Sequence, residues 1–517
     1  MAVLPPQPHI DHLRREARDL LRAARAADAA ATVRILAVSD RPTLAAAQLA
    51  VARDYGFPSW AKLKIEVQAR ADDLASLADE FCRASIRDWT GRAVRMLAAR
   101  PELADYNLAT AVVLGDVVKV RNAISADPAL ATMPDPGTGW TALQAACASR
   151  WNQLDPARAE GLTAIAELVL NAGADPNGRT DSSERSAHWR PLQCAVSGAA
   201  NPAITRLLLE RGAVPTDDDL YMAGFAEDHQ CLGLLLDHAA DVRAIARKAL
   251  AAPISGNDTE GVRMLLEAGA DPAHYHNDDG QPFPVIYAAE QANADTEIVD
   301  LLLSHGADPE LPGPDGKSPH AFATSMGRTD LAALLRQHGA TDDATEVDVL
   351  LSACLRGDRA GAERQLARQP DLVSQLTSEQ QATAMIRAAE TGNIDALRLT
   401  LDVGFAIGAR GGDHGSTALH AAAFSGSAEV VRLLIDRGAD IEARDGEWDD
   451  TAISWSIVGS GFGPADNPSA DWLATITVLI EAGASLRDLT ITADDPKPPS
   501  PAVAELLRSY GVREERR

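Results

Sequence analysis

The residues best suited to metal chemistry form one short cluster. His274, Tyr275 and His276 are followed by Asp278 and Asp279, and imidazole and carboxylate groups are common metal ligands. The cluster falls where a polar turn is expected, and polar residues are needed there in any case. We therefore predict no metal site.

A second candidate is the glycine-rich segment GSGFG, residues 459–463. A phosphate-binding loop needs a strand before its glycines, and none is expected here. The chain also has no GxSxG, HExxH or GxxxxGK[ST] motif, so the usual sequence evidence for serine hydrolases, zinc proteases and P-loop enzymes is missing. We predict no catalytic residue and no cofactor.

The rest of the sequence is organised by a repeating helical unit, seen most clearly in residues 415–440. Thr417 is a good N-cap for a first helix, and Gly426 ends that helix. Ser427 can cap a second helix, whose apolar residues recur at helical spacing up to Gly438. Two helices this short cannot bury both apolar faces against each other, so the unit must stack on copies of itself.

Glycines mark the copies. Gly-Ala-Asp occurs at Gly173, Gly269, Gly306 and Gly438, and Gly-Ala alone recurs, the last time at Gly483. The 310 residues from Gly173 to Gly483 make nine steps of about 34 residues. A second glycine marker, a helix-ending glycine followed by a helix-capping residue, lies midway through five units, at Gly115, Gly256, Gly357, Gly392 and Gly426, and has the same period.

This pattern resembles the ankyrin-repeat family, whose T-P-L-H motif is seen as TALH from Thr417, with weaker echoes from Thr141, Arg190 and Ser318. The resemblance covers about residues 72–515. It implies an all-α fold: a solenoid of helix-turn-helix repeats with short β-turn fingers, preceded by a small helical domain. The motif histidine survives clearly only as His420, so its hydrogen bonding must be lost or replaced elsewhere.

Two units carry insertions of 11 residues between their helices, because 25 residues separate Gln144 from Val169, and Ser454 from Leu479, against 14 from His420 to Leu434. We expect both insertions to form loops.

Three segments are predicted. Residues 1–70 lack the repeat markers and form an N-terminal helical module, similar to one found before ankyrin arrays in bacterial proteins. Residues 72–342 form a first block of repeats and residues 343–515 a second, with one continuous solenoid as the alternative.

Composition limits the partners. The chain carries 48 basic and 74 acidic residues, a net charge of −26. Residues 1–70 carry 11 basic and 7 acidic residues, or +4, which leaves −30 on the repeats. Such a surface repels nucleic acid and favours a basic protein partner, although the charge could also serve solubility alone.

The chain has no apolar run that could span a membrane and its start lacks a signal-peptide core, so we expect no membrane partner and a cytoplasmic location. The five cysteines show no CxxC pair, and we expect buried, reduced thiols.

Aromatic residues give the best indication of a binding site. Trp140 and Trp189 each directly precede a first helix, a position that the resemblance places at the root of a finger on the concave, partner-binding surface. The candidates on neighbouring fingers are His188, Tyr275, His276, His414 and Trp448. Large amphipathic side chains there are typical of binding hot spots, but they could also pack against the next finger.

The sequence therefore predicts a protein-binding scaffold, adaptor or inhibitor that acts through the concave face. The alternative is an enzyme with catalytic groups in that groove or in the two insertions. The oligomeric state and the partner's identity are not predicted.

Overall fold

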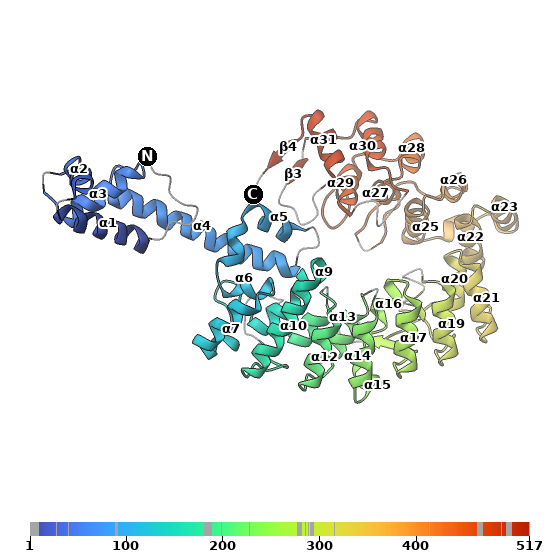
Figure 1. The fold of residues 1–517 in the computed structure, drawn as a ribbon. Coiled ribbons are helices and arrows are strands. Elements are labelled where there is room, and N and C mark those ends of the chain that lie inside the picture. The colour runs from blue at the N-terminus through green and yellow to red at the C-terminus, as the bar shows by residue number, and fades with distance from the viewer. Residues whose placement is uncertain are drawn as a thin grey trace. The chain divides into compact units, whose positions relative to one another are not determined.

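A computed structural model describes most of the chain. The residues it describes are 10–26, 28–39, 41–87, 91–179, 189–197, 199–226, 228–276, 282–284, 286–287, 289, 294–314, 316–412, 414–462, 469–487, 489–492 and 499–515. They fold mainly as short helices (Figure 1). The chain divides into two compact units, residues 1–256 with 263–270, and residues 257–262 with 271–517.

The first unit begins with a small helical module that has its own apolar core, built from residues between Leu13 and Val67. Its helices are α1 (Ile10–Arg25), α2 (Ala29–Leu36), α3 (Leu44–Asp54) and the first half of α4 (Trp60–Arg87). Side-chain caps begin two of them: Asp28 accepts from the Ala31 N–H at 2.8 Å and Thr43 from the Ala46 N–H at 3.2 Å. Because α4 is continuous through residue 70, the predicted edge of the module lies inside a helix.

The rest of the first unit is a stack of helix pairs. Its elements are α5 (Arg92–Ala99), the 3-10 helix η1 (Pro101–Asp105), α6 (Leu108–Val113), α7 (Val117–Ala126), the 3-10 helix η2 (Pro128–Ala131), α8 (Ala142–Ala148), α9 (Trp151–Leu154), α10 (Pro156–Asn171), α11 (Pro191–Val196), α12 (Pro202–Glu210), α13 (Asp217–Ala223), α14 (Gln230–His238), α15 (Val242–Ile245), α16 (Ala251–Ser255) and α17 (Thr259–Glu267), the last shared with the second unit. First helices pack on first helices (α6 on α8, α8 on α11, α11 on α13), and second helices pack on second helices (α10 on α12, α12 on α14).

The second unit continues the same arrangement. Its elements are β1 (His274–His276), β2 (Pro282–Pro284), α19 (Thr296–Ser304), α20 (Pro319–Ser325), α21 (Thr329–Gln337), α22 (Glu346–Leu355), α23 (Arg359–Arg368), α24 (Leu372–Gln375), α25 (Ser378–Glu390), α26 (Ile394–Asp402), α27 (Ala418–Phe424), α28 (Ala428–Asp436), α29 (Ala452–Phe462), α30 (Trp472–Glu481), β3 (Thr490–Thr492), α31 (Pro501–Ser509) and β4 (Arg513–Glu515). β1 pairs with β2 antiparallel, and β3 with β4 parallel.

Within this unit α25, α27 and α29 pack in sequence as first helices, and α28 packs on α30 (Figure 1). One apolar core runs from Leu350 to Val512. α20 also packs on α22, so contacts cross residue 342. The division into blocks at that residue stays a prediction.

The predicted capping residues and glycines shape each repeat. Thr417 and His420 form a capping box at the start of α27. At the end of α28, Gly438 has φ of +89°, a conformation that glycine adopts easily, and no atom lies near the position of a Cβ. This backbone turn lets the Ala439 N–H bond to the Leu434 carbonyl at 2.9 Å. Leu434 itself is fully buried, which confirms the predicted register.

The prediction that the insertions form loops is wrong for most of the first insertion and for the start of the second, whereas residues 469–471 of the second lie outside any helix. The first insertion adds the short helix α9 and lengthens α10 to 16 residues, and the second lengthens α29 to 11 residues, against 7 in α27. Their helices bury apolar residues: Trp151 in α9 is 6% exposed and its indole N–H donates to Ser85 Oγ at 3.0 Å. Packing of this kind favours a helix over a loop.

All five cysteines are buried free thiols, as predicted. Burial raises the pKa of Cys231 to about 11 and that of Cys354 to about 12, so both stay protonated at neutral pH. Among the described helices, none is both long and apolar enough to cross a membrane.

Candidate functional site

The segments that we call fingers are the turns that lead into each first helix. In two of them an aspartate organises the turn. The Asp135 N–H bonds to the Trp140 carbonyl at 2.9 Å, and the Asp445 N–H bonds to the Asp450 carbonyl at 2.9 Å. Each carboxylate then accepts from the N–H groups two and three residues further on. The two fingers therefore share one register, six residues before Thr141 and Thr451.

A third finger has the same register. Gly411 and Ser416 exchange both backbone hydrogen bonds, at 3.1 and 3.0 Å, six residues and one residue before Thr417. His414 therefore occupies the position that Trp448 occupies in the next finger, three residues before the residue that precedes the first helix, Thr417 or Thr451. We call this the tip position, and the residue directly before that threonine, or its equivalent in other fingers, the root position.

The tip residues of these consecutive fingers stack on each other. The ring centroids of His414 and Trp448 are 4.3 Å apart. His414 Nδ1 also pairs with the Glu447 carboxylate, and the Gly446 N–H donates to the His414 carbonyl at 2.8 Å. The two fingers are thus joined by a backbone hydrogen bond, a side-chain hydrogen bond between His414 and Glu447, and a ring contact.

From the tips, a row of rings continues along the first helices. Trp455 of α29 lies 5.9 Å from Trp448 and 6.0 Å from Phe424 of α27, between ring centroids, and Phe424 lies 5.6 Å from Phe462 at the end of α29. We call His414, Trp448, Trp455, Phe424 and Phe462 the aromatic row. Its ring pairs are edge-to-face or tilted, as aromatic side chains prefer.

Much of the aromatic row is open to solvent. Trp448 is 54% exposed, Phe462 40% and Phe424 37%, and Val458, on α29 between Trp455 and Phe462, is 48% exposed. Exposed apolar side chains are common singly, but a contiguous set of this size is typical of an interaction surface.

Asp445 fixes the tip that carries Trp448. Its carboxylate accepts from the Trp448 N–H at 2.7 Å, the Glu447 N–H at 2.9 Å, the Asp450 N–H at 3.2 Å and the Trp455 indole N–H at 2.9 Å. Burial alone would raise the pKa of Asp445, but these hydrogen bonds outweigh it and lower the pKa from 3.8 to about 2. The ionised carboxylate therefore holds both tryptophans of the aromatic row in place.

The structure corrects the interpretation of Trp140. Its side chain is 3% exposed and cannot offer the indole to a partner. The root position faces the neighbouring repeat: in another finger the root residue Lys317 bonds through Nζ to Asp348 of the next first helix, at 2.5 Å. Sequence reasoning put the side chains of Trp140 and Trp189 at the binding surface from root positions. Among the tip residues, Trp448 is 54% exposed, His414 is half-buried and Thr138 is buried, so the tip is open at Trp448.

The structure places the other predicted site residues as follows. Trp189 is half-buried at a root position. His188 lies outside the described residues, and Tyr275 and His276 lie in β1, with side chains outside the description. His414 and Trp448 are brought together, as described above. Trp455, Phe424 and Phe462 were missed, although the spacing of Trp455 and Phe462 along one helix, seven residues apart, was a usable signal.

The motif histidine links repeats, and a glutamine replaces it once. His420 Nε2 bonds to the Asp450 carbonyl at 3.2 Å, while its Nδ1 lies 2.9 Å from Thr417 Oγ1. In the earlier unit, Gln144 Nε2 donates to the Trp189 carbonyl at 2.5 Å and Gln144 Oε1 lies 3.1 Å from Thr141 Oγ1. The sequence left open whether this hydrogen bonding is lost or replaced, and in the repeat of Gln144 it is replaced in kind.

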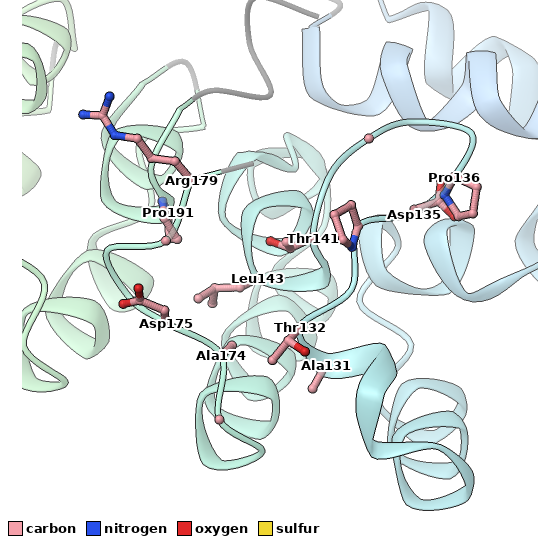
Figure 2. Close-up of a pocket in the computed structure, with 14 residues that line it drawn as sticks. Ala131, Thr132, Asp135, Pro136, Thr141, Leu143, Ala174, Asp175, Arg179 and Pro191 are labelled. Carbon is pink, nitrogen blue, oxygen red and sulfur yellow. The ribbon is translucent and has the colours of Figure 1, made fainter. Parts of the chain in front are cut away.

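A pocket of about 880 Å³ lies in the first unit (Figure 2). Of the described residues that line it, the ionisable ones are Asp135, Asp175 and Arg179. Asp135 is committed to its own finger, and Asp175 accepts from the Asn177 N–H at 2.9 Å. In Figure 2 the Arg179 guanidinium and Asp135 lie at opposite ends of the pocket, so these groups do not converge as acid and base would.

Metal ligands are not gathered in the described part of the chain, where no group of three or more His, Cys, Asp or Glu side chains could hold an ion. Asp278 and Asp279 of the cluster considered from the sequence lie outside the described residues.

Paired helices that stack through their first and second helices, with fingers between the pairs, define an all-α ankyrin solenoid. Residues 250–348 and 350–445 match the family described as Ankyrin repeats (3 copies), and these residues are ankyrin repeats.

Solved structures to which this chain is similar include an ankyrin repeat domain from Acinetobacter baumannii AYE, 23% identical over 38% of this chain and 98% of that one, with a TM-score of 0.31. The human ASB11 ankyrin repeat domain is 20% identical over 46% of this chain and 99% of its own, with a TM-score of 0.22. A search among curated protein sequences found no match.

Proposed function

We propose that the chain is a cytoplasmic protein-binding scaffold, adaptor or inhibitor that holds its partner on the aromatic row of the second unit. Ankyrin repeats are generally protein-interaction modules, and the fingers with the first helices form the face that carries this row. The role given to Trp189 at its own finger remains a second, weaker candidate within the same function.

The observation that carries the proposal is the combined exposure and rigidity of the row. Trp448 is 54% exposed, yet its backbone N–H is held by Asp445 and its ring by His414 and Trp455. A large aromatic side chain that is already ordered loses little entropy on binding, so burial of its surface translates into affinity.

Charge supports a basic partner. The repeats carry the chain's excess of acidic residues, and a positively charged protein would be steered toward them. We expect this attraction to raise the association rate and to weaken with salt, while the aromatic row sets the dissociation rate.

The test is capture of proteins from cells of the source organism on the immobilised chain, followed by calorimetry with the protein that is captured. Trp448→Ala and Phe462→Ala are expected to weaken its binding by about tenfold or more. Phe225→Ala is the matched control, because Phe225 is 56% exposed and lies in the first unit. If Trp448→Ala and Phe462→Ala bind the captured protein as tightly as Phe225→Ala and the unaltered chain do, the proposed surface is wrong.

A further inference from the structure

The aromatic row has two chemically different ends, and this difference suggests what it binds. At the Trp448 end, residues 440–450 contain six acidic side chains and one basic one, a net charge of −5. At the other end, α29 has no ionisable residue in its 11 positions. The row therefore passes from an acidic tip to an apolar helix face.

We infer that the aromatic row binds one extended segment of a protein partner, with an arginine side chain at Trp448 and an apolar side chain against Phe424 and Phe462. This inference rests on the proposed function and adds the chemistry of the ligand.

The acidic end suits a guanidinium group. The open Trp448 ring offers a face for stacking, and the carboxylates of Glu447 and Asp449 lie on the same finger, with side chains 48% and 81% exposed. A planar cation can stack on an indole and bond to a carboxylate at once, which a compact ammonium group does less well. Arg444 of the same finger bonds through its guanidinium to the Asp449 carbonyl at 2.6 Å and lies 3.4 Å from the Asp449 carboxylate, so an incoming guanidinium would share this carboxylate.

The apolar end suits an aliphatic side chain. Phe424, Val458 and Phe462 expose neighbouring apolar surface there, and Gly459 lets the two helices approach: a Cβ on it would lie 2.2 Å from the Phe424 carbonyl oxygen. An aliphatic side chain laid on these rings would be removed from water on most of its surface.

The spacing of the rings sets the length of the segment. Three ring-to-ring steps of 5.9, 6.0 and 5.6 Å lead from Trp448 to Phe462. About five residues of extended chain cover such a path, and a helix about 10 Å wide would overhang a row that is one ring wide. The arginine and the apolar residue should therefore be about five positions apart.

The test uses a synthetic Gly/Ser peptide that carries one arginine and, about five positions later, one leucine. It is titrated into the full chain while the NMR signals of the tryptophan indole N–H groups are followed. We expect millimolar binding that shifts the signals of Trp448 and Trp455. Replacing arginine by citrulline, which has nearly the same shape but no charge, should weaken binding about fivefold or more, and replacing leucine by serine should weaken it similarly.

Variants of the chain locate the site. Glu447→Gln combined with Asp449→Asn should weaken the arginine peptide and leave the citrulline peptide unchanged. Trp448→Ala should weaken both peptides, and Phe225→Ala neither. Raising the sodium chloride concentration from about 50 to about 500 mM should weaken binding of the arginine peptide and leave binding of the citrulline peptide unchanged.

Each contrary result has its own meaning. Equal binding of arginine and citrulline peptides, still lost in Trp448→Ala, would overturn the cation at the tip and leave the proposed surface standing. Absence of peptide binding, or binding unchanged by Trp448→Ala, would overturn the inferred ligand, and the capture experiment would then judge the surface by itself. If light scattering shows that the chain is a dimer and that Trp448→Ala is a monomer, the aromatic row binds a second copy of the chain instead, and the inferred ligand is wrong.

Discussion

Asp445 connects the stability of a finger with the position of Trp448 and Trp455. Four donors converge on its carboxylate, which is 5% exposed, so the ionised form is favoured by the fold. Thr138 occupies the corresponding tip in the Asp135 finger, where no aromatic side chain needs support. The same turn therefore only shapes the backbone in the Asp135 finger, whereas in the Asp445 finger it also holds the ring of Trp448 in an exposed position.

The lowered pKa of Asp445 predicts a pH-dependent stability. Because the folded value is about 2 and the ordinary value 3.8, the contribution is present above pH 3.8 and is lost as the pH falls toward 2. Asp445→Asn should therefore destabilise the chain by about 2 kcal/mol near pH 6, and by about half of that at pH 3. Urea unfolding of both proteins across this range measures the difference. If the difference in unfolding free energy between the wild-type chain and Asp445→Asn does not become smaller at low pH, the charge of the carboxylate is not what stabilises the finger.

His420 and Gln144 make the same link between repeats, so glutamine should substitute for the histidine. His420→Gln is expected to cost less than about 1 kcal/mol, and His420→Ala about 1 to 3 kcal/mol, because alanine removes one of the two hydrogen bonds to the Asp450 carbonyl and leaves the Thr417 cap without its histidine partner. Thermal melting of the two variants decides the point. Equal losses would mean that the volume of the side chain matters and its hydrogen bonds do not.

The pKa of His420 gives the same pair of variants a second readout. Burial lowers this pKa below 6.5, so the wild-type chain should lose stability as the pH falls below 6.5. His420→Gln has no proton to take up at this position and should lack that part of the pH dependence.

At the scale of the helices, close approach at glycines decides how the insertions pack. Gly161 in α10 lies against the Gly115 carbonyl, and Gly459 in α29 lies against the Phe424 carbonyl; in each case a Cβ would be 2.2 Å from the oxygen. Both glycines belong to the two units with insertions. In these two units the glycine therefore lets the longer helix stay in the stack, because it admits the neighbouring backbone.

Gly161→Ala is expected to destabilise the first unit by about 1 to 3 kcal/mol, because the added methyl group must push two backbones apart. Gly256→Ala is the control. Its Cβ would lie 3.5 Å from the Ala252 carbonyl oxygen, which is an ordinary contact, and the φ of Gly256 is −82°. Urea unfolding should separate the two variants. A loss below about half a kcal/mol for Gly161→Ala would show that the helices can shift without cost.

The repeats could be predicted from the sequence because their determinants are local. Thr417, Gly438 and Leu434 act within one hairpin, and periodicity reveals them. The helical insertions could not, since Trp151 is fixed by Ser85, 66 residues earlier in the chain. Nor could the tip and root positions be told apart without the finger's hydrogen bonds, so the sequence left open whether Trp140 binds a partner or packs against the next finger.

At the scale of the whole chain, α4 belongs to two cores at once. Leu63 and Val67 lie in the core of the N-terminal module, whereas Phe81 is fully buried with its ring centroid 6.3 Å from that of Trp151. Ser85 adds its hydrogen bond to the same tryptophan. The first half of the helix thus serves the module, and the second half covers the first repeats.

This division predicts how far the chain can be shortened. Deletion of residues 1–70 removes the module's core with its apolar residues and keeps the part of α4 that covers Trp151, so the repeats should remain folded with the loss of little more than one capping element. Deletion of residues 1–87 also removes Phe81, Cys82 and Ser85, which exposes Trp151 and leaves its indole N–H without its acceptor. Circular dichroism during thermal unfolding should therefore show a folded first truncation and a second that melts at a clearly lower temperature. If both truncations melt together, α4 does not cap the repeats. If the first already loses its helical signal at room temperature, the module is an integral part of the fold.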